Sequence, residues 1–188
     1  MEPTQAKRVI EAVLFVSGQP MPMKRLLEVL PDLDAAQVRQ FIHLLQEEYR
    51  QGGRAFEIQE VAGGFQFVTD RALAPWLARA LSRPKPDAVS AAAMETLAII
   101  AYRQPATKAE IEAVRGVDVT ASLEGLLERQ FIRIVGRKDS PGRPFLYGTT
   151  PEFLRHFGLK SVEALPPMAQ PVVQEASAAA ESPTAATT

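Results

Sequence analysis

The sequence predicts an α+β protein that is mainly helical and contains two small antiparallel hairpins. Three observations lead to this prediction. Apolar residues recur at helical spacing in segments bounded by capping residues, and two pairs of short segments rich in β-formers are each joined by turn residues. The order of these elements then repeats along the chain. The composition, 46% hydrophobic and 23% charged, is ordinary for a globular protein.

The densest helix is predicted over residues 91–102, in the second half of the chain. Its apolar positions follow helical spacing: Met94, Leu97, Ala98 and Ala101. We expect this stripe to be buried inside its own domain, and the alternative is that this helix is a docking face for a partner. Gln104-Pro105 ends the helix, and the capping box from Thr107 to Glu110 starts a second helix that reaches about Val114.

The elements after this second helix complete a recognisable order. A third helix is predicted from Asp118, as its N-cap, to about Gln130. Two strands over 131–135 and 145–147 follow, joined by the turn residues 139–142, and Thr150-Pro151 caps a last helix. Three helices, a hairpin and a closing helix are the order of a winged-helix domain.

The first half of the chain repeats this order. A helix over residues 5–16 has apolar residues at helical spacing, Val9, Ala12, Val13 and Val16, and Gln19-Pro20 follows it as Gln104-Pro105 follows the later one. Asp34, with Gln37 three residues on, starts a helix that runs to Gln51. Strands over 56–61 and 65–68 flank a turn at Gly63-Gly64. Asp70 caps a short helix whose Trp76 we expect to pack in the core or between the domains; the alternative is a stacking platform for a base or a partner.

The sequence therefore predicts tandem winged-helix domains, each with a small antiparallel hairpin. Residues 1–81 form the N-terminal domain, 82–89 a linker that contains two prolines, and 90–165 the C-terminal domain. Residues 166–188 form an Ala, Pro, Ser and Thr tail that we expect to be disordered. Because each domain is small for an independent core, we expect contact between the domains or with a partner.

The sequence gives no support for catalysis. There is no cysteine, no P-loop and no nucleophile elbow, so we expect no enzyme activity, no catalytic or metal site and no cofactor. The longest uninterrupted apolar run, residues 97–102, is far shorter than the roughly 20 residues that a membrane span needs. We expect a cytoplasmic protein with no membrane contact.

Charge argues against DNA reading by the third helix of either domain. Both third helices are slightly acidic, whereas a helix that faces phosphates should be basic. The second hairpin is the exception, with Arg133, Arg137, Lys138 and Arg143 against Asp139. Either these cations make a weak, non-specific DNA contact, or Arg137 and Arg143 brace the hairpin or pair with a partner's carboxylates.

Several segments of the second domain resemble one known family. They are Glu95 to Pro105, Arg115-Gly116-Val117, Gly136-Arg137, Pro141-Gly142-Arg143-Pro144, Tyr147 to Thr150, Phe153-Leu154 and Phe157-Gly158-Leu159. Together they closely resemble the segregation and condensation protein B family. The resemblance covers nearly the whole chain up to Leu165-Pro166 and is looser in the first domain.

The resemblance implies a non-enzymatic bacterial subunit. It implies a homodimer, joined mainly through the N-terminal domains, that binds the kleisin segregation and condensation protein A (ScpA) and through it the structural-maintenance-of-chromosomes (SMC) ATPase. Such a complex condenses and segregates the chromosome at the nucleoid before cell division. The candidate partner-binding residues that match the family's motifs are Arg103, Gln104, Arg115, Arg137 and Arg143. The alternative is a winged-helix DNA-binding transcription regulator.

Overall fold

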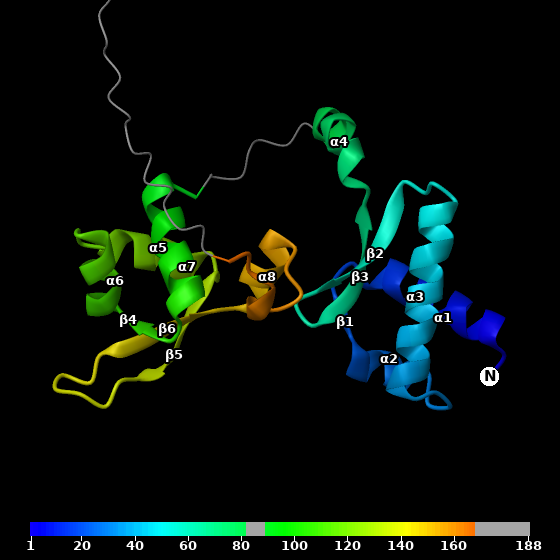
Figure 1. Ribbon diagram of the computed structural model, residues 1–188, viewed down its shortest axis with the longest axis horizontal. Helices are drawn as coiled ribbons and strands as arrows, with labels where there is room; N and C mark the ends of the chain where they lie inside the picture. Colours follow the sequence, from blue (N-terminus) through cyan, green and yellow to red (C-terminus); the bar gives the residue numbers. More distant parts are fainter. Residues whose placement is uncertain (82–88, 168–188) are drawn as a thin grey trace, which may run out of the picture.

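The protein consists of two modules with the same element order (Figure 1). The computed structural model describes residues 1–81, here the N-module, and residues 89–167, here the C-module. Each module has a three-stranded antiparallel sheet whose middle strand is the last in sequence, in the orders β1-β3-β2 and β4-β6-β5. The predicted fold class, mainly helical α+β with tandem winged-helix domains, is confirmed.

The N-module packs three helices against its sheet. Its elements are α1 (Pro3–Ser17), β1 (Met21–Pro22), α2 (Met23–Val29), α3 (Ala35–Gln51), β2 (Phe56–Val61), β3 (Gly64–Thr69), a 3₁₀ turn (Arg71–Leu73) and α4 (Ala74–Leu81). The capping box of Asp34 and Gln37 at the start of α3 is confirmed. The core takes its apolar side chains from α1, α2, α3 and the sheet: Ile10, Leu14, Leu26, Val38, Ile42, Leu45, Ile58 and Phe65.

The C-module repeats this arrangement. Its elements are α5 (Ala91–Arg103), β4 (Ala106–Thr107), α6 (Lys108–Arg115), α7 (Thr120–Glu128), β5 (Ile132–Arg137), β6 (Phe145–Thr149), α8 (Pro151–Phe157) and a 3₁₀ turn (Val162–Ala164). Thr150 caps α8 with Pro151 at the first position, as predicted. The core includes Leu97, Ile100, Ile111, Val119, Leu123, Leu126, Ile132 and Phe153.

The capping box at the start of α6 also fastens the second hairpin. The Glu110 carboxylate accepts hydrogen bonds from the Thr107 N–H at 2.8 Å and its hydroxyl at 2.9 Å, as the sequence predicted. The Lys138 ammonium, at the end of the hairpin, lies 2.5 Å from the same carboxylate. The Glu110 carboxylate therefore caps the N-terminus of α6 and also holds Lys138 of the wing.

The start of α7 differs from the prediction. The helix begins at Thr120, with Val119 at the N-cap position. The Asp118 carboxylate instead accepts from the Thr120 N–H at 3.0 Å and lies 3.0 Å from the Lys108 ammonium. Asp118 thus stabilises the loop before the helix, because its side chain bonds two residues on, and Val119 is left to enter the core.

The first hairpin turns one residue earlier than predicted. Ala62 and Gly63 form the turn, with φ of 51° and 73°, so Gly64 is the first residue of β3. A Cβ atom on Gly64 would lie 2.8 Å from the carbonyl carbon of Met21. The glycine is required here because β1 approaches β3 closely, rather than because the turn needs it.

The buried face of α5 is rotated relative to the predicted stripe. Leu97, Ala101 and Ile100 are buried, but Met94 is 39% exposed, so its predicted burial is wrong. Thr96 is fully buried instead, with its hydroxyl donating to the Ala92 carbonyl at 2.9 Å. A polar residue thus occupies a core position, which apolar periodicity alone does not reveal.

The prediction that Trp76 packs in the core or between the modules is also wrong. Trp76 is 63% exposed, and α4 buries none of its residues within the described part of the chain. Figure 1 shows α4 projecting beyond the end of the sheet, because the 3₁₀ turn before it leads the chain away from the module. The predicted linker 82–89 lies outside the described residues except for Val89 and so stays a prediction.

The modules meet at the tip of the first hairpin. The Ala62 N–H donates to the Leu159 carbonyl at 2.9 Å, and the Gly63 N–H donates to the Lys160 carbonyl at 3.0 Å. Figure 1 shows this tip reaching the segment after α8. The chain then continues to Pro166 and Pro167, beyond the predicted domain end, and the predicted disordered tail otherwise lies outside the described residues.

A glycine pair tests the close approach of β1 and β3. Gly64→Ala should lower the free energy of unfolding by about 1–3 kcal/mol, because a Cβ would overlap the Met21 backbone. Gly125→Ala in α7, where a Cβ meets nothing within 4 Å, is the control and should raise it by about 0.5–1 kcal/mol. Urea unfolding followed by circular dichroism measures both; equal effects would contradict this account of Gly64.

The Glu110 carboxylate predicts a pH dependence of stability. Lys138, followed by the N–H and hydroxyl of Thr107, lowers the pKa of Glu110 from its ordinary 4.5 to about 2. Because the pKa is lowered in the folded state, the stabilisation is complete above pH 4.5 and is lost as the pH falls to about 2. Over this window the melting temperature of Glu110→Gln should fall less steeply than that of the wild type.

The matched control for this pH dependence is Glu128→Gln. It removes an exposed carboxylate for which the described residues provide no hydrogen-bond or ion-pair partner. That variant should keep the wild-type slope. Identical slopes for wild type and Glu110→Gln would mean that the contact between Glu110 and the wing does not persist in solution.

Candidate partner-binding surfaces

Within residues 1–81 and 89–167, no three or more His, Asp or Glu side chains are grouped so that they could hold a metal ion. No helix in these ranges is both long and apolar enough to cross a bilayer. The surfaces that stand out are exposed apolar side chains next to unpaired cations, and each module has its own.

The N-module exposes apolar side chains at the end of α1. Phe15 is 79% exposed and Val16 is 82% exposed, and Phe56 on β2 is 42% exposed. A hollow of about 370 Å³ lies between α1 and the first hairpin and is lined by Arg8, Glu11, Ala12, Phe15, Phe56 and Phe67. We call this face the α1 surface. Large apolar patches on a soluble domain mark contact sites.

The sequence stripe on α1 did not identify this face as exposed. The core takes Ala6, Ile10 and Leu14, which form a second apolar stripe on the same helix, while the stripe ending at Val16 is partly or fully outside the core. Helix α1 is therefore apolar on two faces, whereas the core of its own module covers only one of them. The second apolar face of α1 is the feature of the sequence that could have predicted a contact surface.

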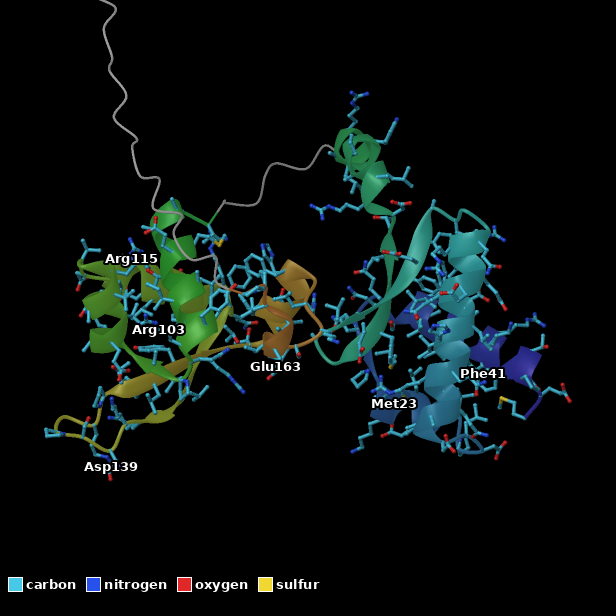
Figure 2. All side chains as sticks on the ribbon, in the orientation of Figure 1. Met23, Phe41, Arg103, Arg115, Asp139 and Glu163 are labelled. Carbon is cyan, nitrogen blue, oxygen red and sulfur yellow. The ribbon has the colours of Figure 1, made fainter. Side chains whose placement is uncertain are left out.

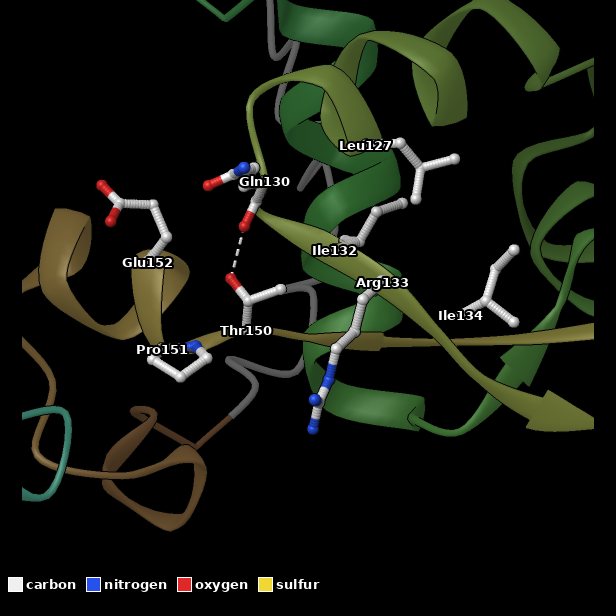
Figure 3. A pocket seen from close by; sticks show the side chains of 8 residues that line it. All are labelled: Leu127, Gln130, Ile132, Arg133, Ile134, Thr150, Pro151 and Glu152. Atoms are coloured by element: carbon white, nitrogen blue, oxygen red, sulfur yellow. Dashed lines mark hydrogen bonds between the residues drawn. The ribbon is translucent and has the colours of Figure 1, made fainter.

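The C-module has a hollow of about 560 Å³ beside its edge strand β5, here the β5 hollow (Figure 3). It lies between the end of α7, β5 and the start of α8, and its lining residues are Leu127, Gln130, Ile132, Arg133, Ile134, Thr150, Pro151 and Glu152. The Thr150 hydroxyl donates to the Gln130 carbonyl, which joins two of its walls. Figure 3 shows the Arg133 side chain extending away from Leu127 and Ile134.

A second, narrower groove of about 290 Å³ lies between α5 and α8. Its apolar lining includes Met94 and Ala98, the two residues of the predicted stripe that the core does not bury. Leu165 and Pro166 cover one side, and the Tyr102 hydroxyl donates to the Pro166 carbonyl at 2.5 Å. The chain's own C-terminal segment therefore already occupies part of this groove.

Two of the five predicted partner-binding residues, Arg115 and Gln104, make contacts at the two ends of α5. Arg115 donates to the Ala92 carbonyl at 2.6 Å and the Thr96 hydroxyl at 2.9 Å, lies 3.1 Å from Glu95, and has a side chain only 14% exposed. The Gln104 amide oxygen accepts from the N–H of Thr149 at 2.6 Å and from its hydroxyl at 3.0 Å. Both side chains fasten α5 to its neighbours.

The wing arginines differ from each other. The Arg137 guanidinium lies 4.2 Å from the centre of the Phe145 ring and donates to the Arg143 carbonyl at 3.3 Å. These contacts brace the wing, which is one of the roles that the sequence left open for Arg137. The Arg143 side chain has no polar partner among the described residues, and neither has that of Arg103 at the end of α5. Figure 2 shows Arg103 and Arg115 on the C-module and Asp139 at the wing tip.

Two arginine substitutions separate these roles. Arg115→Ala should lower the free energy of unfolding by about 1.5–3 kcal/mol, because charged hydrogen bonds to Ala92 and Thr96 are lost. Arg103→Ala, which removes no contact of this kind, should change it by at most about 0.5 kcal/mol. Chemical denaturation measures both values. A neutral Arg115→Ala would show that its contacts do not hold α5.

The chain is similar to known proteins along most of its length. Residues 8–168 match the family model described as segregation and condensation complex subunit ScpB. Segregation and condensation protein B of Symbiobacterium thermophilum is 50% identical over 162 residues, which cover 86% of this chain and 73% of that protein. The Syntrophotalea carbinolica protein of the same name is 44% identical over 166 residues, covering 88% of this chain and 83% of that protein.

Among solved structures, a dimer of the ScpB N-terminal domain complexed with an ScpA peptide is 27% identical, covering 41% of this chain and 95% of that chain, with a TM-score of 0.39. The family model, like both relatives, spans the two modules. The chain belongs to the ScpB family of segregation and condensation complex subunits.

Proposed function

We propose that this protein is a non-enzymatic subunit of an SMC-kleisin complex, that it forms a homodimer, and that it binds the kleisin ScpA. The SMC ATPase is reached through the kleisin, and the complex supports condensation and segregation of the chromosome in the cytoplasm. The observation that carries the proposal is family membership across both modules, with a separate exposed apolar surface on each.

The α1 surface is the proposed dimer contact. Phe15 and Val16 are the most exposed large apolar side chains in the described residues, so a second copy that covers them removes a large apolar area from water. Two-fold symmetry would place the same surface of each copy in contact. Trp76 and Leu81 on α4 are 63% and 58% exposed and extend the apolar area that a partner could cover.

The C-module is the proposed kleisin site. A long, flexible kleisin segment pays an ordering entropy when it binds, so apolar hollows must supply affinity. The β5 hollow and the groove beside α5 supply such surfaces. Arg103 and Arg143, which lack internal polar partners, are the proposed charge contacts among the predicted site residues.

Charge supports a protein partner rather than a DNA operator. Helix α7, which occupies the position of a recognition helix, carries Glu124 and Glu128 and no basic residue within its bounds. Neutralising phosphates supplies most non-specific DNA affinity, so this helix is poorly suited to a major groove. Any DNA contact is proposed to be weak, non-specific and confined to the wing cations.

Light scattering tests the proposal directly. The wild type should have twice the 20.6 kDa mass of one chain and should form a heavier complex with purified ScpA of the same organism. Val16→Glu should shift the protein toward the monomer, since it places a charge in an apolar contact. Val117→Glu on the C-module, at a position 54% exposed, is the matched control and should stay dimeric.

Three outcomes would contradict the proposal. The wild type would remain a monomer at all concentrations, it would not bind ScpA, or it would prefer one duplex sequence over random DNA by about a thousandfold in a mobility-shift titration. The last result is the behaviour of a sequence-specific regulator.

A further inference from the structure

The two modules can be aligned residue by residue through their sheets. Strand β1 pairs Met21 with Phe65, and β4 pairs Ala106 with Tyr147. On the other side of the middle strand, Phe65 pairs with Glu60 and Tyr147 pairs with Ile134. Glu60 of β2 and Ile134 of β5 are therefore equivalent positions, one in each edge strand.

The same registers align the neighbouring residues. Gln59 is equivalent to Arg133, and Ile58 is equivalent to Ile132. Ile58 and Ile132 are each 2% exposed, so the alignment matches buried with buried. The two edges therefore differ in their outward chemistry while their core positions agree.

The β2 edge has the polar character that protects an exposed strand from pairing. Glu60 lies 3.5 Å from Arg39, and the Gln59 amide donates to the Glu57 carboxylate at 2.6 Å. Charged residues on an edge strand oppose the addition of another strand. The polar side chains of the β2 edge thus have their partners within the N-module.

The β5 edge has an exposed apolar side chain, Ile134, at the position where the β2 edge has the charged Glu60. Ile134 is 46% exposed and Val135 is 47% exposed, and the Arg133 side chain has no polar partner among the described residues. No described strand pairs with its outer side. The register shift of β5 falls between Ile134 and Gly136, so residues 132–134 form the regular part of the edge, and they line the β5 hollow.

We propose that the β5 edge, from Ile132 to Ile134, binds an extended segment of the kleisin as an added strand. Main-chain hydrogen bonds to β5 supply part of the affinity, and the β5 hollow receives an apolar side chain against Leu127 and Ile134. Cross-strand neighbours share a face, so the residue that meets Arg133 is acidic and stands next to the apolar residue in the bound segment. This inference rests on the proposed kleisin binding.

Hydrogen exchange on the full chain with purified ScpA tests the added strand. Binding should slow exchange of those amides in residues 132–134 that face away from β6, because the others already pair within the sheet, and leave those of β2 unchanged. Ile134→Glu, which installs the residue found at the equivalent position of β2, should weaken ScpA binding by at least about tenfold, or about 1.4 kcal/mol. Arg133→Gln should weaken it less and reduce its salt dependence.

Gln59→Glu, at the β2 position equivalent to Arg133, is the matched control and should leave the affinity within about twofold. Melting curves establish that each variant is folded, which is expected because exposed substitutions change stability little. If ScpA binds the wild type but β5 stays unprotected and Ile134→Glu binds as well as wild type, the added strand is wrong while the proposed function stands. No ScpA binding by the wild type refutes the proposed function itself.

Concentration-dependent protection of β5 without ScpA would instead mean that a second copy covers the edge. That result would also overturn the inference. Light scattering of Ile134→Glu distinguishes it, because the kleisin-binding edge should leave the dimer mass unchanged.

Discussion

The C-module depends on polar side chains that hold α5 at both ends. Arg115, from the end of α6, bonds the carbonyl of Ala92 and the hydroxyl of Thr96, so a buried polar residue can lie at the helix interface. Gln104 joins the other end of α5 to β6 through Thr149. Because leaving a buried hydroxyl or amide unpaired costs free energy, these contacts fix where the helix sits against the sheet. The position of α5 in turn shapes the groove between α5 and α8.

Much of the fold was predictable because local signals and packing agree. The capping boxes of α3 and α6 and the cap of α8 could be predicted from single residues, Asp34, Thr107 and Thr150, and the repeat of the element order from the sequence as a whole. The errors arose where tertiary contacts decide. Thr96 is buried because Arg115 reaches it, and Trp76 is exposed because α4 leaves its module, and neither fact is local to the sequence.

The candidate sites were less predictable for the same reason. A motif marks Arg103, Gln104, Arg115, Arg137 and Arg143 alike, although three of them use their polar groups inside the fold. Which cations remain unpaired is a property of the packed module. The exposed edge of β5 could not be predicted from the sequence either. Arg133 and Ile134 can be compared with Gln59 and Glu60 only when the strand registers are known. The comparison is possible because the two modules share one fold, so that each position of β5 has an equivalent position in β2.

The join between the modules connects these surfaces. Two backbone hydrogen bonds link the first hairpin to Leu159 and Lys160, and no described helix or strand of one module packs broadly on an element of the other. Each such bond contributes about 0.5–1.5 kcal/mol, so a ligand needs only a small preference between two arrangements to change the angle between the modules. Leu159 also lines the groove beside α5. Leu159 therefore takes part in both features: it lines the groove, and its carbonyl accepts the hydrogen bond from the first hairpin, so the groove and the join between the modules share one residue.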